Sequence, residues 1–124
     1  MHEHDAMLEK YAEGKIFFDA GLFAKAQKIF FSLTLNYPTN WEFWFSLGAS
    51  YQAQKQYLSA ASSYLKATIL NSKNAIIYYK IAECMLSMDE KKNALSMLEI
   101  AKSYASDESL IDKIILLTKQ NQVL

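Results

Sequence analysis

Residues 41–72, WEFWFSLGASYQAQKQYLSAASSYLKATILNS, contain two runs in which large and small residues recur with helical spacing. Each run places one set of residues on a single helical face. These residues are Trp44, Leu47, Gly48 and Tyr51 in the first run, and Tyr57, Ala60, Tyr64 and Ala67 in the second. Small residues let two helices cross closely while an aromatic ring fills the space beside them. The segment therefore predicts an antiparallel helix pair.

The same pattern returns 34 residues away in both directions, which is the period of a tetratricopeptide repeat. Upstream, the matching residues are Gly14, Phe17, Gly21, Phe23, Ala26, Phe30, Leu33 and Pro38. Downstream, they are Tyr78, Ile81, Ala82, Met85, Ala94, Leu98 and Ala101. A non-repeating helical bundle is the alternative, but it would not place alanines at 26, 60 and 94 in one register.

The register predicts an all-α fold of three tetratricopeptide repeats, stacked as antiparallel helix pairs in a right-handed superhelix, with a C-terminal capping helix. Residues 1–6 show no periodicity, so we expect a disordered lead-in there. Residues 7–124 form a single domain in this interpretation. Its repeats cover about 7–40, 41–74 and 75–106, and the terminal helix covers 107–122.

Several polar residues have the spacing of helix starts. Thr39 and Glu42 predict a capping box, while Asn74 and Ser106 are candidate caps for the third repeat and the terminal helix. The turn at Lys55 and Gln56 lacks a glycine, so it must either use ordinary residues or be slightly strained. The apolar stripe over 110–117 is wider than one helix pair needs, which predicts deep packing or weak homodimer formation.

Composition excludes several classes of function. The formal net charge is zero and the basic residues are scattered, so neither nucleic acid nor an anionic membrane surface is favoured as a partner. The apolar runs are too short to cross a bilayer and no leader pattern is present, which predicts a cytoplasmic protein without direct membrane association. The single cysteine, Cys84, fits a reducing compartment.

We expect no enzyme, no metal and no cofactor. Phosphate-binding glycine loops and sets of residues suited to nucleophilic catalysis are missing from the sequence. His2 and His4 have no further histidine or cysteine nearby, and two such ligands make a poor metal site. Cys84 lies between Ala82 and Met85 on the third repeat's first helix, so we interpret it as a small buried residue.

Binding is favoured instead, because stacked helix pairs leave a concave surface lined by the first helix of each pair. Side chains one position past each core face should point into this hollow. They are Leu8, Tyr11, Lys15 and Phe18 in the first repeat, Phe45, Ala49 and Gln52 in the second, and Ile76, Tyr79, Glu83 and Leu86 in the third. This row is largely apolar and aromatic, with polar residues suited to a bound peptide. The alternative is that these side chains thicken the core.

Three sequence segments point to one particular family of tetratricopeptide-repeat proteins. They are GLFAKAQKIF at 21–30, LGASYQA at 47–53 followed by Gln56 and Tyr57, and AECML at 82–86. With these motifs the chain resembles the class II type III secretion chaperones, which bind the hydrophobic translocator proteins of bacterial secretion systems. The resemblance implies a cytosolic bacterial chaperone that holds a short extended, proline-containing segment near its cargo's N-terminus in the groove.

The resemblance also implies roles for the groove residues. Tyr11, Lys15, Phe18, Phe45 and Ala49 would form the pockets, and Tyr79 and Leu86 the far wall. Two other hypotheses remain open. A generic repeat scaffold would use the same fold to join proteins, and a needle-subunit co-chaperone would bind an amphipathic helix in place of an extended strand.

Overall fold

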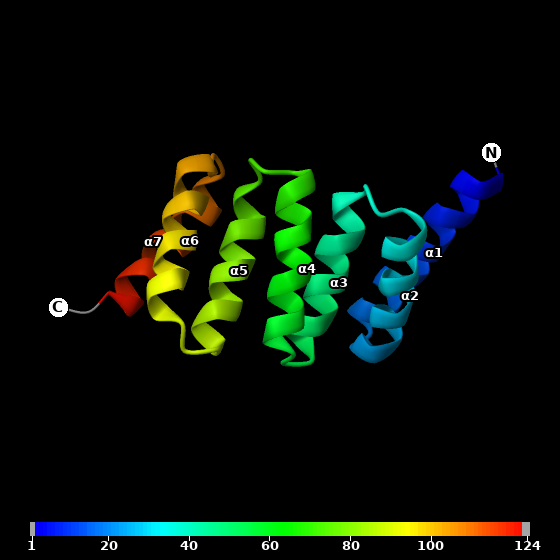
Figure 1. Ribbon diagram of the computed structural model, residues 1–124, viewed down its shortest axis with the longest axis horizontal. Helices are drawn as coiled ribbons and strands as arrows, with labels where there is room; N and C mark the ends of the chain where they lie inside the picture. The colour runs from blue at the N-terminus through cyan, green and yellow to red at the C-terminus, as the bar shows by residue number, and fades with distance from the viewer. Residues whose placement is uncertain (1, 123–124) are drawn as a thin grey trace.

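The computed structural model describes residues 2–122, and all of its regular structure is helical (Figure 1). No strand occurs within this range. The prediction of an all-α chain is therefore confirmed. The helices are α1 (His2–Asp19), α2 (Phe23–Asn36), α3 (Trp41–Ala53), α4 (Tyr57–Leu70), α5 (Ala75–Ser87), α6 (Lys91–Tyr104) and α7 (Glu108–Asn121).

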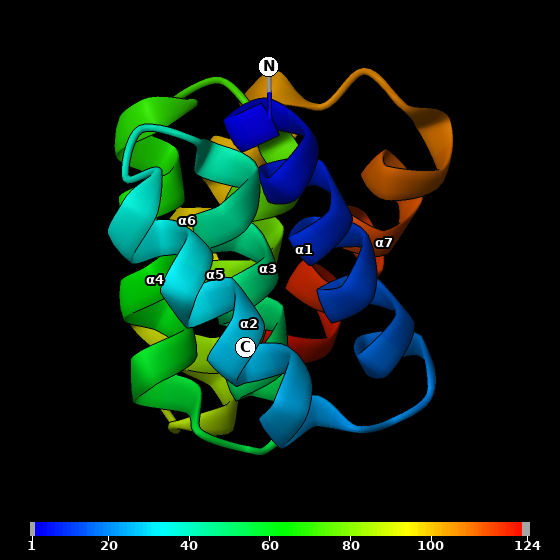
Figure 2. The same ribbon diagram turned by 90° about the vertical axis from the view of Figure 1, so that its right-hand side faces the viewer.

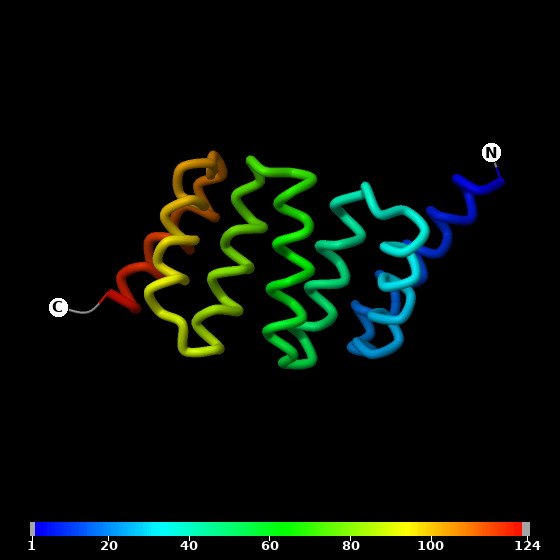
Figure 3. The backbone as a smooth tube through the Cα atoms, viewed as in Figure 1, coloured from blue at the N-terminus to red at the C-terminus, as the bar shows by residue number. Residues whose placement is uncertain are grey.

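Each helix packs on the helix that follows it in the sequence, so the molecule is an elongated row of antiparallel helices (Figure 3). Seen along this row, α4 and α6 lie on one side and α1 and α7 on the other (Figure 2). Successive helix pairs are stacked along the row, α2 on α3 and α4 on α5. This is the arrangement that the 34-residue register predicts.

Close packing between paired helices explains two of the glycines. A Cβ atom on Gly14 would lie 2.6 Å from the ring of Phe30, and one on Gly48 would lie 2.7 Å from the ring of Tyr64. Carbon atoms cannot approach that closely, so an aromatic ring at this position requires glycine on the facing helix. The third repeat places Ala82 at the equivalent position, where it packs in one cluster with Leu98.

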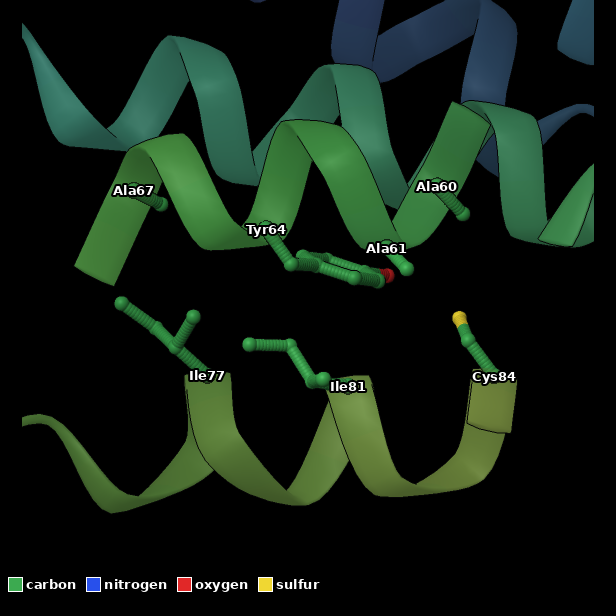
Figure 4. Packing of buried hydrophobic residues seen from close by; sticks show 7 residues of the cluster. All are labelled: Ala60, Ala61, Tyr64, Ala67, Ile77, Ile81 and Cys84. Atoms are coloured by element: carbon green, nitrogen blue, oxygen red, sulfur yellow. The ribbon is translucent and has the colours of Figure 1, made fainter. Parts of the chain in front are cut away.

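The central core forms between α4 and α5. Figure 4 shows the ring of Tyr64 lying between the two helices, facing Ile77 and Ile81, with Ala61 and Cys84 near its hydroxyl end. All of these residues are buried, and Tyr64 is completely inaccessible to solvent. The small side chains let the helices approach until the ring fills the remaining space.

Two of the three expected caps are displaced by one residue. The cap of α3 is Asn40 and not Thr39, because the Asn40 side chain accepts a hydrogen bond from the Glu42 amide at 3.0 Å. The cap of α7 is Asp107 and not Ser106, since its carboxylate accepts from the Leu110 amide at 3.0 Å. A carboxylate also suits the positive end of the helix dipole.

Asn74 caps α5 as predicted and accepts from the Ile76 amide at 3.2 Å. Asn40 lies 34 positions earlier, so the repeat register already indicated the cap of α3. The turns follow the same register, because Gly21, Lys55 and Asp89 all have positive φ, at 79°, 63° and 61°. Of the two alternatives for this turn, the structure favours slight strain at Lys55, since non-glycine residues adopt this conformation at a cost.

The N-terminal segment differs from expectation. Residues 2–6 continue α1 instead of forming a disordered lead-in, while Met1 lies outside the described residues. Their side chains are exposed, so no apolar periodicity marks the helix. Glu3 and Asp5 in the first turn favour it electrostatically.

Candidate peptide-binding groove

Two adjoining hollows lie along the surface formed by the first helices. The first hollow has a volume of about 250 Å³ and lies between α1 and α3. Its lining residues are Tyr11, Lys15, Phe18, Asp19, Phe30, Phe45, Ser46 and Ala49. Five of the predicted groove residues thus come together in one site, although they belong to two different repeats.

Aromatic rings held by the core make up the walls of the first hollow. The ring centroid of Tyr11 lies 5.1 Å from that of Phe43 and 6.0 Å from that of Phe30. On the opposite wall, the Phe45 ring lies 5.3 Å from that of Tyr64. Tyr11 and Phe45 are half-buried, so each packs on the core and also presents apolar surface to solvent.

One positively charged side chain, Lys15, lies beside the aromatic walls of the first hollow. The Lys15 ammonium group lies 5.2 Å from the centroid of the Tyr11 ring, within the range of a cation–π interaction. Lys15 is exposed, and Asp19 lies one helical turn further along α1 at the same hollow. The first hollow is therefore an apolar pocket with charged residues at its rim.

The second hollow, of about 220 Å³, continues from the first. Phe18 and Ala49 line both hollows, which makes the groove continuous past α3. The other residues of the second hollow are Gln52, Ala53, Tyr64 and Lys80. The second hollow thus carries two polar side chains, Gln52 and Lys80, beside the aromatic residues Phe18 and Tyr64.

A hydrogen-bonded chain joins three helices at the second hollow. The Tyr64 hydroxyl on α4 donates to Gln52 Oε1 on α3 at 2.8 Å. Gln52 Nε2 donates to Glu83 Oε1 on α5 at 3.2 Å, and Lys80 Nζ lies 3.3 Å from the same carboxylate oxygen. We call these four residues the Gln52 chain.

Burial and the Glu83 carboxylate keep three side chains at this site protonated: Tyr64, Tyr79 and Cys84. Burial, followed by the nearby Cys84 and Glu83, raises the pKa of Tyr64 well above its usual value. Burial and the Glu83 carboxylate raise the pKa of Cys84 from 9.0 to about 12, partly opposed by Lys80. The same two causes, burial first, raise the pKa of Tyr79. The Cys84 thiol is thus buried and stays protonated at neutral pH.

The remaining predicted residues lie apart from these hollows. Tyr79 and Leu86 are half-buried against the cluster that contains Ala82 and Leu98, so they pack at the far end of the surface. Leu8 is 48% exposed on α1 and lines neither hollow. Peptide binding by each of the eleven predicted residues stays a prediction.

Sequence reasoning missed Asp19, Ser46, Lys80 and the part that Tyr64 plays in the groove. Lys80 could have been found, because it precedes Glu83 by three positions and the two residues face each other on one helix. Tyr64 was assigned to the core from its spacing, and it is fully buried. Its hydroxyl end nevertheless reaches the groove, where it bonds to Gln52 on α3.

Among residues 2–122, no three histidine, cysteine, aspartate or glutamate side chains gather closely enough to hold a metal ion. The helices of this same range include none with the length and apolar character needed to cross a membrane.

No protein-family model matches the chain, and no curated protein matches its sequence. Solved structures do match. The Yersinia enterocolitica chaperone SycD, in complex with a peptide of the translocator YopD, is 24% identical with a TM-score of 0.90, over 94% of this chain and 92% of SycD. PcrH from Pseudomonas aeruginosa is 25% identical with a TM-score of 0.89, over 96% of this chain and 93% of PcrH.

A chain of a type III secretion complex from Aeromonas hydrophila is 26% identical, with a TM-score of 0.90 over 94% of this chain and 80% of the other. PcrH also matches in complexes with the chaperone-binding regions of PopD and PopB, and SycD in an alternative dimer. The predicted resemblance is confirmed by these neighbours: the chain has the fold of the type III secretion translocator chaperones.

Proposed function

We propose that this protein is a chaperone that binds an extended segment of a hydrophobic type III secretion translocator in the groove formed by the two hollows. The observation that carries the proposal is the continuous groove on a chain with this fold. SycD has this fold and is bound to a peptide of the translocator YopD. PcrH has it too and is bound to the chaperone-binding regions of PopD and PopB.

The groove suits an extended peptide on physical grounds. Alternate side chains of an extended chain point the same way, so apolar residues can enter a hollow while the residues between them face solvent. Tyr11, Phe18 and Phe45 offer aromatic surface that is already held in place, which reduces the entropy lost on binding. Because these rings are partly exposed in the free protein, covering them with an apolar segment is favourable.

Such a chaperone would act in the bacterial cytoplasm, where it keeps the translocator soluble and competent for secretion. Its work is binding, and we expect no catalysis. The hydrophobic segments of the cargo would otherwise aggregate, since large exposed apolar surfaces associate in water.

Co-expression with the proteins encoded beside its gene tests the proposal. A translocator among them should be soluble and co-purify with the chaperone, and should aggregate when expressed alone. Circular dichroism then separates binding modes, because an extended segment adds no helical signal whereas a needle-type amphipathic helix does. Neighbouring proteins that are equally insoluble with and without this chain would contradict the proposal, and a gain of helix would favour the co-chaperone alternative.

We also expect weak self-association in the absence of cargo. On α7 the Ile114 side chain is buried, but Leu116 is 58% exposed, so the apolar stripe at 110–117 is only partly covered. Sedimentation at increasing protein concentration should show a rising average mass. A strictly monomeric profile up to high micromolar concentration would contradict this expectation, and Leu116→Ser should weaken the association if the stripe is responsible.

A further inference from the structure

The side-chain amide of Gln52 is fixed from two sides. Its Oε1 atom only accepts hydrogen bonds, so the Tyr64 hydroxyl at 2.8 Å must donate to it. The Glu83 carboxylate also only accepts when ionised, so Gln52 Nε2 must face it, at 3.2 Å. Because the two partners require opposite ends of the amide, only one of its two flipped orientations satisfies both.

Both partners are themselves held firmly. The Tyr64 ring is completely buried and packs against Gly48, where even a Cβ atom would not fit. Its raised pKa keeps the hydroxyl protonated, and therefore a donor, throughout the physiological range. The carboxylate of Glu83 is held by the ion pair with Lys80, at 3.3 Å.

These bonds use half of the hydrogen-bonding capacity of Gln52. A glutamine amide has two N–H groups and two acceptor positions on its oxygen. The Gln52 side chain uses one of each within the described residues. One donor on Nε2 and one acceptor on Oε1 are left, on a residue that lines the second hollow.

A donor and an acceptor on one amide complement the C=O and N–H of a peptide main chain. We propose that Gln52 hydrogen-bonds the backbone of the bound segment at the second hollow, with Tyr64 and Glu83 as the positioning residues that fix its amide. This inference rests on the proposed function and adds a rule of specificity. The segment must be extended there, and the contacted residue must carry an N–H, so it is not proline.

The alternative is that the Gln52 chain only ties α3, α4 and α5 together. The two interpretations differ in one respect. A structural tie affects all ligands alike, whereas a backbone contact makes binding sensitive to chemistry at a single peptide position.

The test uses the YopD peptide that SycD binds, with one N-methyl group placed in turn at each residue other than proline. N-methylation removes the N–H of that residue and leaves its side chain unchanged. We expect one position at which it weakens binding to wild type by about tenfold, the size of a typical net hydrogen bond. In Gln52→Leu the unmodified peptide should bind more weakly, and methylation at that position should cause no further loss.

Two matched variants complete the experiment. Tyr64→Phe keeps the ring but removes the donor that orients the amide, so the sensitivity at that one position should shrink. Phe18→Ala removes apolar surface shared by both hollows, so it should weaken all peptides equally and keep the position-specific effect. Melting temperatures of all variants separate loss of fold from loss of contact.

Three results would overturn the inference. A scan without a sensitive position, on a peptide that wild type binds well, would refute the backbone contact and leave the proposed function intact. Sensitivity that persists unchanged in Gln52→Leu would assign the contact to another residue. If folded wild type does not bind the unmodified peptide, the proposed function for this ligand fails together with the inference.

Discussion

The two hollows of the groove are built from equivalent positions of successive repeats but differ in chemistry. The first is walled by aromatic side chains and has a lysine at its rim. In the second, Gln52 takes the place that Phe18 has one repeat earlier, and its amide is bonded to two other helices. At the next equivalent position along each helix, Lys15 is replaced by Ala49 and then by Glu83.

This difference shows that the repeat determines the position of each residue in the groove, whereas the side chain determines the chemistry at that position. The 34-residue register places each residue on the groove side of its helix, whatever its type. The side chain then decides whether the site accepts an apolar group or a hydrogen bond. A groove with one site of each kind can select both the side chains and the backbone conformation of a ligand.

The largest expected effect, on folding stability, comes from disrupting the contact between Gly48 and the Tyr64 ring beneath the second hollow. Gly48→Ala places a Cβ atom 2.7 Å from the Tyr64 ring, so the ring or the helix must move. We expect a loss of about 1–3 kcal/mol in the free energy of unfolding, the usual cost of overpacking. Urea denaturation followed by circular dichroism measures this loss.

The third repeat supplies the control for this prediction. It combines Ala82 with Leu98, so the double variant Gly48→Ala/Tyr64→Leu copies a pairing that the chain already uses. The double variant should be more stable than Gly48→Ala alone. If Gly48→Ala unfolds at the same urea concentration as wild type, the packing described here is wrong.

Replacing an aromatic residue of the first hollow by the glutamine of the second should have the next largest effect, which is on peptide affinity. Phe18→Gln gives the first repeat the residue of the second and removes an aromatic surface shared by both hollows. A buried phenylalanine side chain contributes about 1.5–3 kcal/mol, so affinity for a translocator peptide should fall at least about tenfold. Calorimetry measures the change.

Leu58→Gln is the matched control for this exchange. Leu58 is 72% exposed on α4 and lines neither hollow, so the same replacement there should leave affinity unchanged. Equal losses in the two variants would show that general destabilisation, and not the groove, explains the result.

Alkaline pH should destabilise the core beside the second hollow, where Cys84 packs in one cluster with Tyr64. The pKa of Cys84 is raised from 9.0 to about 12 in the folded chain, so the unfolded chain loses this proton first as the pH rises. The folded state is therefore destabilised progressively between about pH 9 and about pH 12. Denaturation midpoints measured across this range should fall.

Cys84→Ala should reduce this fall, because it removes one of the two strongly shifted groups and leaves Tyr64. The folded wild type should also react slowly with iodoacetamide at neutral pH, since its thiol is buried and protonated. Rapid alkylation of the native protein would contradict the burial of Cys84.

The fold was predictable because its packing depends on residues at fixed spacing. Gly14 with Phe30, and Gly48 with Tyr64, recur at the repeat period and can be recognised in the amino-acid sequence alone. The first hollow was predictable for the same reason, since Tyr11, Lys15, Phe18, Phe45 and Ala49 follow from the faces of two helices. What failed were single-residue decisions, as between Thr39 and Asn40 at the start of α3.

The Gln52 chain was only partly predictable. Spacing placed Gln52 and Glu83 on the groove surface but gave no sign that they are bonded to each other, because the distance between two helices depends on the side chains packed beneath them. The contribution of Tyr64 depends on the hydrogen bond from its hydroxyl to Gln52 on a neighbouring helix, which periodicity does not specify. Burial and hydrogen bonding together define this part of the site.

The most direct test of the groove measures peptide affinity and folding stability on the same variant, Phe45→Ala. Phe45 lines the first hollow and is half-buried, so its truncation should cost about 2 kcal/mol or more in binding the YopD peptide, as for a central anchor of an interface. The melting temperature should change little, and Leu58→Ala should leave both quantities unchanged. If Phe45→Ala instead loses the roughly 3–5 kcal/mol of stability expected of a core residue and binds the peptide as tightly as wild type, Phe45 belongs to the core and the groove account is wrong.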